Sequence, residues 1–211
     1  NVGCIPSKAL LHTAEIINEA TEISHMGVTF AKPKVNLDKM REGKDKVVKR
    51  LTGGLGALAK QRKVEVITGT AQFSGLNTMT VVTADGDVTV AFDYCIIACG
   101  SSAVKIPSFP NDDSRLIDST GALALEDVPD KMLVIGGGII GLEMATVYSA
   151  LGSKIDIVEL QPGLIPGCDR DLVRPLQKRL SSKVNSIMLE TSVTEVKAQK
   201  NGLKVSFEGK K

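Results

Sequence analysis

The sequence of 211 residues has few aromatic side chains and almost no net charge. Phenylalanine, tyrosine and tryptophan together make up 3% of it, and 26 basic residues against 24 acidic ones leave a formal net charge of +2. Nucleic-acid-binding proteins present a basic face, and those that bind single strands add aromatic side chains on which bases stack. The composition therefore argues against a nucleic acid as the partner.

Long apolar runs and paired cysteine motifs are also missing. No apolar run approaches the roughly 18 residues of a membrane-spanning helix, and the opening residues, NVGCIPSK, do not form a signal peptide. The four cysteines show no C-x-x-C and no spacing typical of a disulfide framework or a metal site. We therefore expect no membrane association, no metal and a reducing compartment, the cytoplasm.

The most informative stretch is KMLVIGGGIIGLEMATVYSALGSKIDIVE, residues 131–159. Four apolar residues predict a buried strand that leads into Gly136, Gly138 and Gly141, with the spacing G-x-G-x-x-G. A helical pattern and a second strand follow. In a dinucleotide-binding βαβ unit the first glycine allows a tight turn, the second lets the backbone approach a pyrophosphate, and the third lets helix and strand pack closely.

Neighbouring residues complete the expected nucleotide site. The pyrophosphate would bind the free amides and the positive dipole end of the helix, which adds Gly137, Ile139 and Ile140 to the three glycines. Glu159 ends the second strand, where its carboxylate can accept hydrogen bonds from ribose hydroxyls. Because Glu159 would repel a 2′-phosphate and residues 155–167 contain no arginine or lysine, the sequence predicts NAD rather than NADP.

The N-terminal segment NVGCIPSKALLH places a thiol at the start of a predicted helix. Gly3 and Pro6 mark the turn into this helix, and Gly27 ends its apolar stripe. Cys4 then lies at the helix N-terminus, with Lys8 one turn further along the same face. Free amides, the helix dipole and an ammonium group all stabilise a thiolate. An ordinary buried thiol at a helix start fits the composition equally well.

A long helix is expected over residues 36–63, with a solvated, lysine-rich outer face. Its cluster Gly53, Gly54 and Gly56 indicates close packing against another backbone or a cofactor, or else a helix break near Thr52. The residues do not decide between these alternatives.

Short strands are expected at residues 64–68, 72–73, 78–83 and 94–98, with a hairpin turn at Asp85-Gly86. A second hairpin is expected around Asn201-Gly202, between strands at residues 193–196 and 203–207. Cys95 and Cys99 would lie on one face of the strand at residues 94–98, about 13 Å apart at the usual strand rise. That separation is too large for a disulfide, so both are expected to be small buried core residues.

Four segments together resemble the flavin-dependent pyridine nucleotide–disulfide oxidoreductases: GCIPSKALLH, LTGGL, DSTGAL and GGGIIGLE. The likeness covers essentially the whole chain. It implies an α/β fold with two FAD/NAD-binding Rossmann-like domains, both incomplete. Residues 1–118 would be the later part of an FAD-binding domain, and residues 119–211 an NAD-binding domain that is incomplete at its C-terminal end.

The resemblance also implies roles for individual residues. Cys4 would be the cysteine that faces the flavin, and its disulfide partner in the family lies five residues earlier, outside this sequence. Lys8 would lie near the isoalloxazine ring and pair with Glu143. Backbone contacts are implied at Ala71 and Gly100 for FAD and at Val193 for the adenine of NAD. Before Gly100, Cys99 stands where the family usually has threonine.

Within the family, the sequence of these motifs is most similar to that of bacterial members that oxidise dihydrolipoamide with NAD as acceptor. The implied partners are the lipoyl domain of the acyltransferase in 2-oxo acid dehydrogenase complexes and a second copy in a homodimer. The implied cofactors are FAD and NAD, and the implied setting is redox homeostasis in the cytoplasm. The family's FAD glycine motif and catalytic histidine are not in this sequence, so we expect an internal fragment that is inactive alone.

Two alternatives remain open at this point. The first is another disulfide reductase of the family, of the glutathione, mercuric or trypanothione type, although Glu159 argues against those that use NADPH. The second is an NAD-binding module without redox chemistry.

Overall fold

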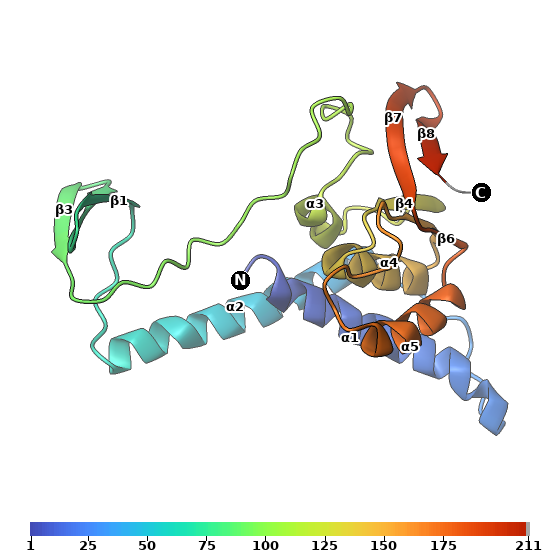
Figure 1. The fold of residues 1–211 in the computed structure, drawn as a ribbon. Coiled ribbons are helices and arrows are strands. Elements are labelled where there is room, and N and C mark those ends of the chain that lie inside the picture. Colours follow the sequence, from blue (N-terminus) through green and yellow to red (C-terminus); the bar gives the residue numbers. More distant parts are fainter. Residues whose placement is uncertain (210–211) are drawn as a thin grey trace. The chain divides into compact units, whose positions relative to one another are not determined.

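The computed structural model describes residues 1–209 (Figure 1). The chain forms two compact units. The larger contains residues 1–49 and the chain from residue 103 onward, and the smaller contains residues 50–102.

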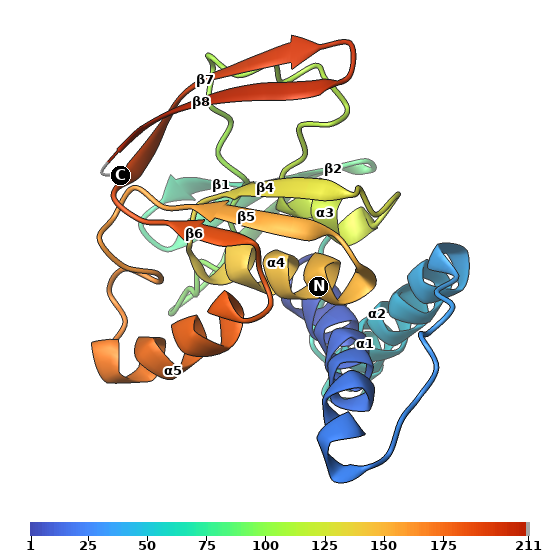
Figure 2. The same cartoon turned by 90° about the vertical axis from the view of Figure 1, so that its right-hand side faces the viewer.

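The larger unit contains a parallel three-stranded sheet with the order β4-β5-β6. Its strands are β4 (Lys131–Ile135), β5 (Lys154–Val158) and β6 (Ser186–Met188), connected through the helices α4 (Ile139–Leu151) and α5 (Arg170–Ser181). Figure 2 shows both helices on one face of this sheet. The predicted strand–glycine turn–helix–strand order is confirmed. However, β4 is half-buried rather than buried, because among the described residues it is an edge strand.

Apolar residues of α4 and β5 form the core of the larger unit. Ile155 and Ile157 of β5, and Val147 of α4, have no exposed surface. Tyr148 is also buried, and its hydroxyl donates to the Ala122 carbonyl oxygen at 2.9 Å. This bond ties α4 to α3 (Ser119–Ala124), whose first turn is capped by the Asp118 carboxylate.

The helix α1 (Cys4–Glu22) packs against α4. Its buried stripe includes Leu10 and Ala14, with 1% and 0% of their surface exposed. Gly3 is the residue before the helix, and a short helix η1 (Ile23–Met26) ends at Gly27 in the left-handed conformation. The predicted helix and both its ends are confirmed.

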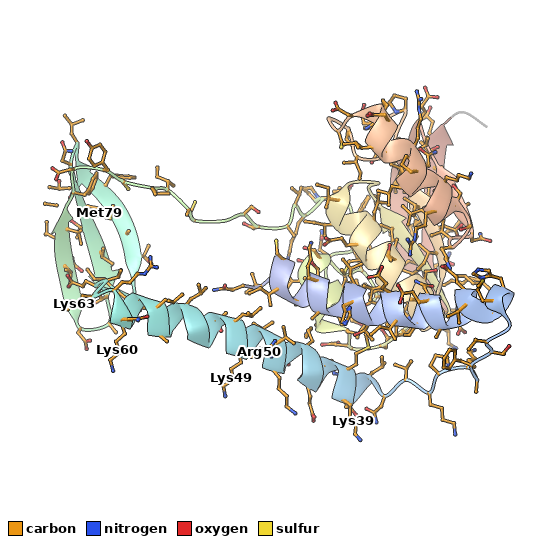
Figure 3. The ribbon with its side chains drawn as sticks, turned by 90° about the horizontal axis from the view of Figure 1, so that it is seen from below. Lys39, Lys49, Arg50, Lys60, Lys63 and Met79 are labelled. Carbon is orange, nitrogen blue, oxygen red and sulfur yellow. The ribbon has the colours of Figure 1, made fainter. Side chains whose placement is uncertain are left out.

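Two elements complete the larger unit. The hairpin β7 (Thr191–Gln199) and β8 (Gly202–Gly209) turns at Gly202, as Asn201-Gly202 predicts. The helix α2 (Leu37–Gln61) begins in this unit and continues into the smaller one. Its outer basic residues are exposed, and Figure 3 shows Lys39 and Arg50 projecting from it.

The glycine cluster in α2 interrupts nothing. The helix is continuous through Gly53, Gly54 and Gly56, so the alternative of a break near Thr52 is wrong. A methyl group built on any of the three glycines would meet no described atom within 4 Å. The packing contact that the cluster suggested is therefore not made by the described residues.

The smaller unit carries an antiparallel sheet of β1 (Thr70–Gly75), β2 (Thr78–Thr83) and β3 (Gly86–Ala91). The strand predicted at residues 78–83 has those bounds, and Gly86 takes the positive φ of 118° that the hairpin turn requires. The strand predicted at residues 72–73 lies inside β1.

Two predicted strands are wrong. Residues 64–68 and 94–98 form no helix or strand and pair with no strand among residues 1–209. Tyr94 and Ile96 are 94% and 91% exposed, and Cys95 and Cys99 are exposed rather than buried. Both segments contain the apolar residue types that are typical of strands. A strand also needs a neighbour for its backbone groups, and neither segment has one here.

Candidate dinucleotide and thiol site

The glycine turn between β4 and α4 has the geometry that a dinucleotide site requires. Gly136 has φ 107°, a left-handed conformation that favours glycine, and its N–H donates to the Val158 carbonyl oxygen at 2.8 Å. The turn is therefore fastened to the carboxyl end of β5, the edge at which ligands bind in open α/β sheets.

The next two motif glycines differ in what a side chain would meet. A methyl group on Gly138 would have no described atom within 4 Å, so the backbone faces open space where a pyrophosphate could approach. A methyl group on Gly141 would lie 2.3 Å from the Gly136 carbonyl oxygen and 3.1 Å from Val134 Cγ1. Gly141 is thus required for the close approach of α4 to β4. These are the conformational roles that the spacing predicts.

The first turn of α4 has exposed side chains and backbone N–H groups that a ligand can reach. Gly138 is the N-cap residue, with extended backbone, and its carbonyl accepts from the Leu142 N–H at 3.0 Å. Ile139 and Ile140 follow with 63% and 57% of their surface exposed. The amides that precede the first helical hydrogen bonds can bind an anion. These residues therefore fit the pyrophosphate of a dinucleotide.

Glu159 lies at the glycine turn, as predicted, but its carboxylate is already engaged. Oε2 accepts a hydrogen bond from the Gly137 N–H and Oε1 accepts one from the Gln161 N–H, each at 2.7 Å. Only 7% of its surface is exposed. A carboxylate has about four acceptor positions, so two remain for ribose hydroxyls. Glu159 therefore has a structural role that the sequence did not reveal.

Gly137, the variable position of the motif, is tightly packed. A methyl group on it would lie 2.5 Å from Leu164 Cδ2 and 3.2 Å from Glu159 Cβ. Its carbonyl oxygen accepts from the Ile165 N–H at 2.9 Å. Sequence reasoning missed Leu164 and Ile165, because their only signal is a position in the loop after the second strand.

Cys4 is the first residue of α1 and is exposed, so the interpretation as a buried thiol is wrong. Lys8 lies one turn further along the helix. The resemblance implied an ion pair between Lys8 and Glu143, and the structure contains it: the Lys8 ammonium donates to Glu143 Oε1. The pair joins the helix that bears the thiol to the helix of the dinucleotide turn.

The ion pair also favours the charged form of Lys8. The hydrogen bond to Glu143 raises the pKa of Lys8 above its ordinary value, against a smaller lowering from desolvation. The electrostatic interactions of Lys8 with Glu143 and with Cys4 raise this pKa too. The Lys8 side chain is 63% exposed and that of Glu143 17%. A cation and an accessible thiol therefore share one end of α1, an arrangement that can stabilise a thiolate or an electron-rich ring.

The three backbone positions expected at the cofactors fall in different units. Ala71 lies in β1 and Gly100 in the segment that follows Cys99, both in the smaller unit. Gly100 has φ 73° and open space where a side chain would be. Val193 lies in β7 of the larger unit, beside the irregularity in its pairing with β8. Their cofactor contacts stay predictions.

Residues 1–209 contain neither a metal-binding cluster nor a membrane-spanning helix. No group of three or more histidine, cysteine, aspartate or glutamate side chains could hold a metal ion. No helix in this part of the chain is long and apolar enough to cross a membrane.

Comparison with known proteins identifies the class of protein. The family model described as pyridine nucleotide-disulphide oxidoreductase matches residues 1–211, and the chain belongs to this family. Members of the family use FAD and NAD. The predicted family and the FAD/NAD-binding Rossmann-like fold are thereby confirmed.

The relatives narrow the class further. The chain is 53% identical to a dihydrolipoyl dehydrogenase of Vibrio cholerae and 50% identical to one of Haemophilus influenzae. Both alignments cover 100% of this chain and 44% of the relative. The structure is similar to the HOCl-induced flavoprotein disulfide reductase RclA of Escherichia coli, with a TM-score of 0.75, 27% identity, and coverage of 99% of this chain and 44% of that one. The chain thus spans less than half the length of these relatives.

Proposed function

We propose that this chain supplies the redox thiol and the NAD-binding turn of a dihydrolipoyl dehydrogenase. The observation that carries the proposal is the Lys8–Glu143 ion pair, which joins the Cys4 helix to the dinucleotide helix. It brings the thiol and the nucleotide turn into one packed unit, as electron transfer between them requires. The identity of 50–53% to dihydrolipoyl dehydrogenases supports the choice of substrate.

The proposed reaction is the oxidation of dihydrolipoamide to lipoamide with reduction of NAD⁺ to NADH and release of one proton. The substrate dithiol would reduce a disulfide between Cys4 and a cysteine outside this sequence by thiol–disulfide exchange. Bound FAD would supply the two-electron chemistry between the thiols and NAD. Lys8, held by Glu143, would place a positive charge beside the Cys4 thiolate and the flavin.

The residues of the larger unit would bind NAD. The amides around Gly138 and the first turn of α4 would hold the pyrophosphate, and Glu159 would accept hydrogen bonds from the ribose and repel a 2′-phosphate. Val193 would contact the adenine. In the smaller unit, Ala71 and Gly100 would contact FAD. Residues 1–118 would then belong to an FAD-binding domain and residues 119–211 to an NAD-binding domain.

The proposal extends to partners and place. The substrate would be the dihydrolipoyl group on the lipoyl domain of the acyltransferase in a 2-oxo acid dehydrogenase complex. The protein would act as a homodimer in the cytoplasm. The likeness to dihydrolipoyl dehydrogenases supports these assignments.

Steady-state kinetics of the full-length protein test the proposal. We expect turnover of dihydrolipoamide with NAD⁺, and none with glutathione disulfide or Hg²⁺ and NADPH. Cys4→Ser should abolish dithiol turnover and leave the Kd for NAD unchanged, whereas the control Cys95→Ser should keep both. Turnover that survives Cys4→Ser would overturn the proposal. NAD binding by an otherwise inactive wild-type protein would favour the NAD-binding module.

A further inference from the structure

The loop after β5, residues 160–169, folds back onto the glycine turn. Its Ile165 N–H donates to the Gly137 carbonyl oxygen at 2.9 Å, and the fully buried Leu164 side chain packs against Gly137. The Glu159 carboxylate also accepts from the Gly137 N–H. Gly137 is thus held through its N–H, through its carbonyl oxygen and by the packed side chain of Leu164.

The guanidinium of Arg170 holds this loop in its folded shape. Nη1 donates to the Leu164 carbonyl oxygen at 2.9 Å and Nη2 to that of Ile165 at 2.7 Å. Nε and Nη2 both donate to the Cys168 carbonyl oxygen, at 3.1 and 2.8 Å. Four of the five N–H groups of Arg170 are therefore used on the loop's own backbone.

The loop needs such a support. Ile165 has φ 46°, a left-handed conformation that is unfavourable for a β-branched residue and persists only where surrounding bonds impose it. The N–H of Ile165 donates to Gly137, and its carbonyl oxygen accepts from Arg170 Nη2 and from the Cys168 N–H at 3.2 Å. Gly163 makes room for the guanidinium, because a methyl group there would lie 2.6 Å from Nη1.

We propose that Arg170, which lies outside the nucleotide motif, is a positioning residue for the NAD-binding turn. By fixing Leu164 and Ile165 it fixes Gly137, and with it the amides that face the pyrophosphate. This inference rests on the proposed NAD site. It also implies that Arg170 does not bind the 2′-phosphate of NADP, because its N–H groups donate to carbonyl oxygens of the loop.

The shape of the side chain explains why lysine is a sharp test. A guanidinium is a planar fork that reaches several acceptors in fixed directions, whereas an ammonium is a single point of charge. Arg170→Lys keeps the charge and removes most of the carbonyl contacts. Gly163→Ala perturbs the same guanidinium without changing any polar group. Arg174→Lys, on an exposed position of the same helix, is the matched control.

The experiment measures the two half-reactions of the full-length protein separately, together with the Kd for NAD⁺. In Arg170→Lys we expect the Kd to rise roughly tenfold, within the range that small misplacements of binding groups produce. Gly163→Ala should change it in the same direction. Flavin reduction by dihydrolipoamide should be unchanged, while reoxidation by NAD⁺ becomes slower at subsaturating NAD⁺. Hydrogen exchange of the peptide covering residues 159–169 should become faster in both variants.

Four outcomes would overturn the inference. The first is an unchanged Kd in Arg170→Lys and Gly163→Ala. The second is equal slowing of both half-reactions, which would indicate general destabilisation. The third is tighter binding of NADP than NAD by the wild type with loss of that preference in Arg170→Lys. A wild-type protein that binds no NAD would overturn this inference and the proposed function together. A normal wild type with unaffected variants overturns the inference alone.

Discussion

Glu159 and Gly137 are joined by a hydrogen bond of 2.7 Å from the backbone N–H of the glycine to the carboxylate. Glu159, which is expected to bind the ribose of NAD, therefore also stabilises the turn that would bind the pyrophosphate. Because the Glu159 side chain would both bind NAD and stabilise the glycine turn, its substitution should affect NAD binding and the stability of the fold.

Replacement of Glu159 by alanine should destabilise the fold and weaken NAD binding. The N–H groups of Gly137 and Gln161 would lose their acceptor, and leaving the buried Gly137 donor unpaired costs about 1–3 kcal/mol, whereas water can reach the exposed Gln161. The lost ribose bonds should weaken NAD binding by a further 1–3 kcal/mol, roughly. Urea denaturation and NAD titration of the full-length protein measure the two effects. Glu195→Ala, at a partly exposed position of β7, is the control, and an unchanged Kd would remove the ribose role.

Two adjacent glycines should respond differently to alanine. Gly137→Ala would drive a methyl group into Leu164 Cδ2, and such overpacking costs about 1–3 kcal/mol of stability. Gly138→Ala meets open space, so stability should hardly change, while the methyl group should obstruct the pyrophosphate and abolish NAD binding. Thermal denaturation paired with NAD titration separates the two. Equal loss of stability in both variants would contradict the packing described for the turn.

Tyr148→Phe should lower stability by about 1 kcal/mol, the usual net worth of one hydrogen bond, because the Ala122 carbonyl oxygen loses its donor. Burial, followed by the charge of Asp127, raises the pKa of Tyr148 from 10.0 to about 12. The folded state thus favours the protonated phenol. This contribution is complete below pH 10 and is lost as the pH rises from 10 towards 12. Denaturation at pH 8 and pH 11 should show the wild-type advantage over Tyr148→Phe shrinking at the higher pH.

Glu143→Gln should move the alkaline limb of the pH–rate profile. The hydrogen bond to Glu143 is the largest cause of the raised pKa of Lys8, so without the carboxylate that pKa falls. The Lys8 ammonium is then lost at a lower pH, and activity should decline at a lower pH than in the wild type. The profile of kcat/KM for dihydrolipoamide measures this shift. Glu22→Gln, which breaks an ion pair with Lys183 at the far end of α1, should leave the profile in place.

Local patterns in the sequence were sufficient for much of this structure. The glycine spacing gave the turn at Gly136, and Asn201-Gly202 gave the β7–β8 hairpin, because each depends on the conformation of a few adjacent residues. Residues 64–68 and 94–98 carry strand-like patterns but form no strand here, because strand formation depends on a distant partner.

The candidate site divides in the same way. The ion pair of Lys8 and Glu143 came from resemblance, since no local pattern links residues so far apart in the chain. The contacts of Leu164, Ile165 and Arg170 could not be anticipated from the sequence. They arise because the loop after β5 returns to the glycine turn through backbone groups, which every residue type shares.

Residues 64–68 and 94–98 have a practical consequence for handling the polypeptide. Ile96 and Tyr94 are exposed above 90%, and Val66 is 71% exposed, in segments that join no sheet among residues 1–209. Such segments are templates for pairing with other chains. A polypeptide of these 211 residues, expressed by itself, will associate with other copies through both segments. It will therefore aggregate more readily as its concentration rises.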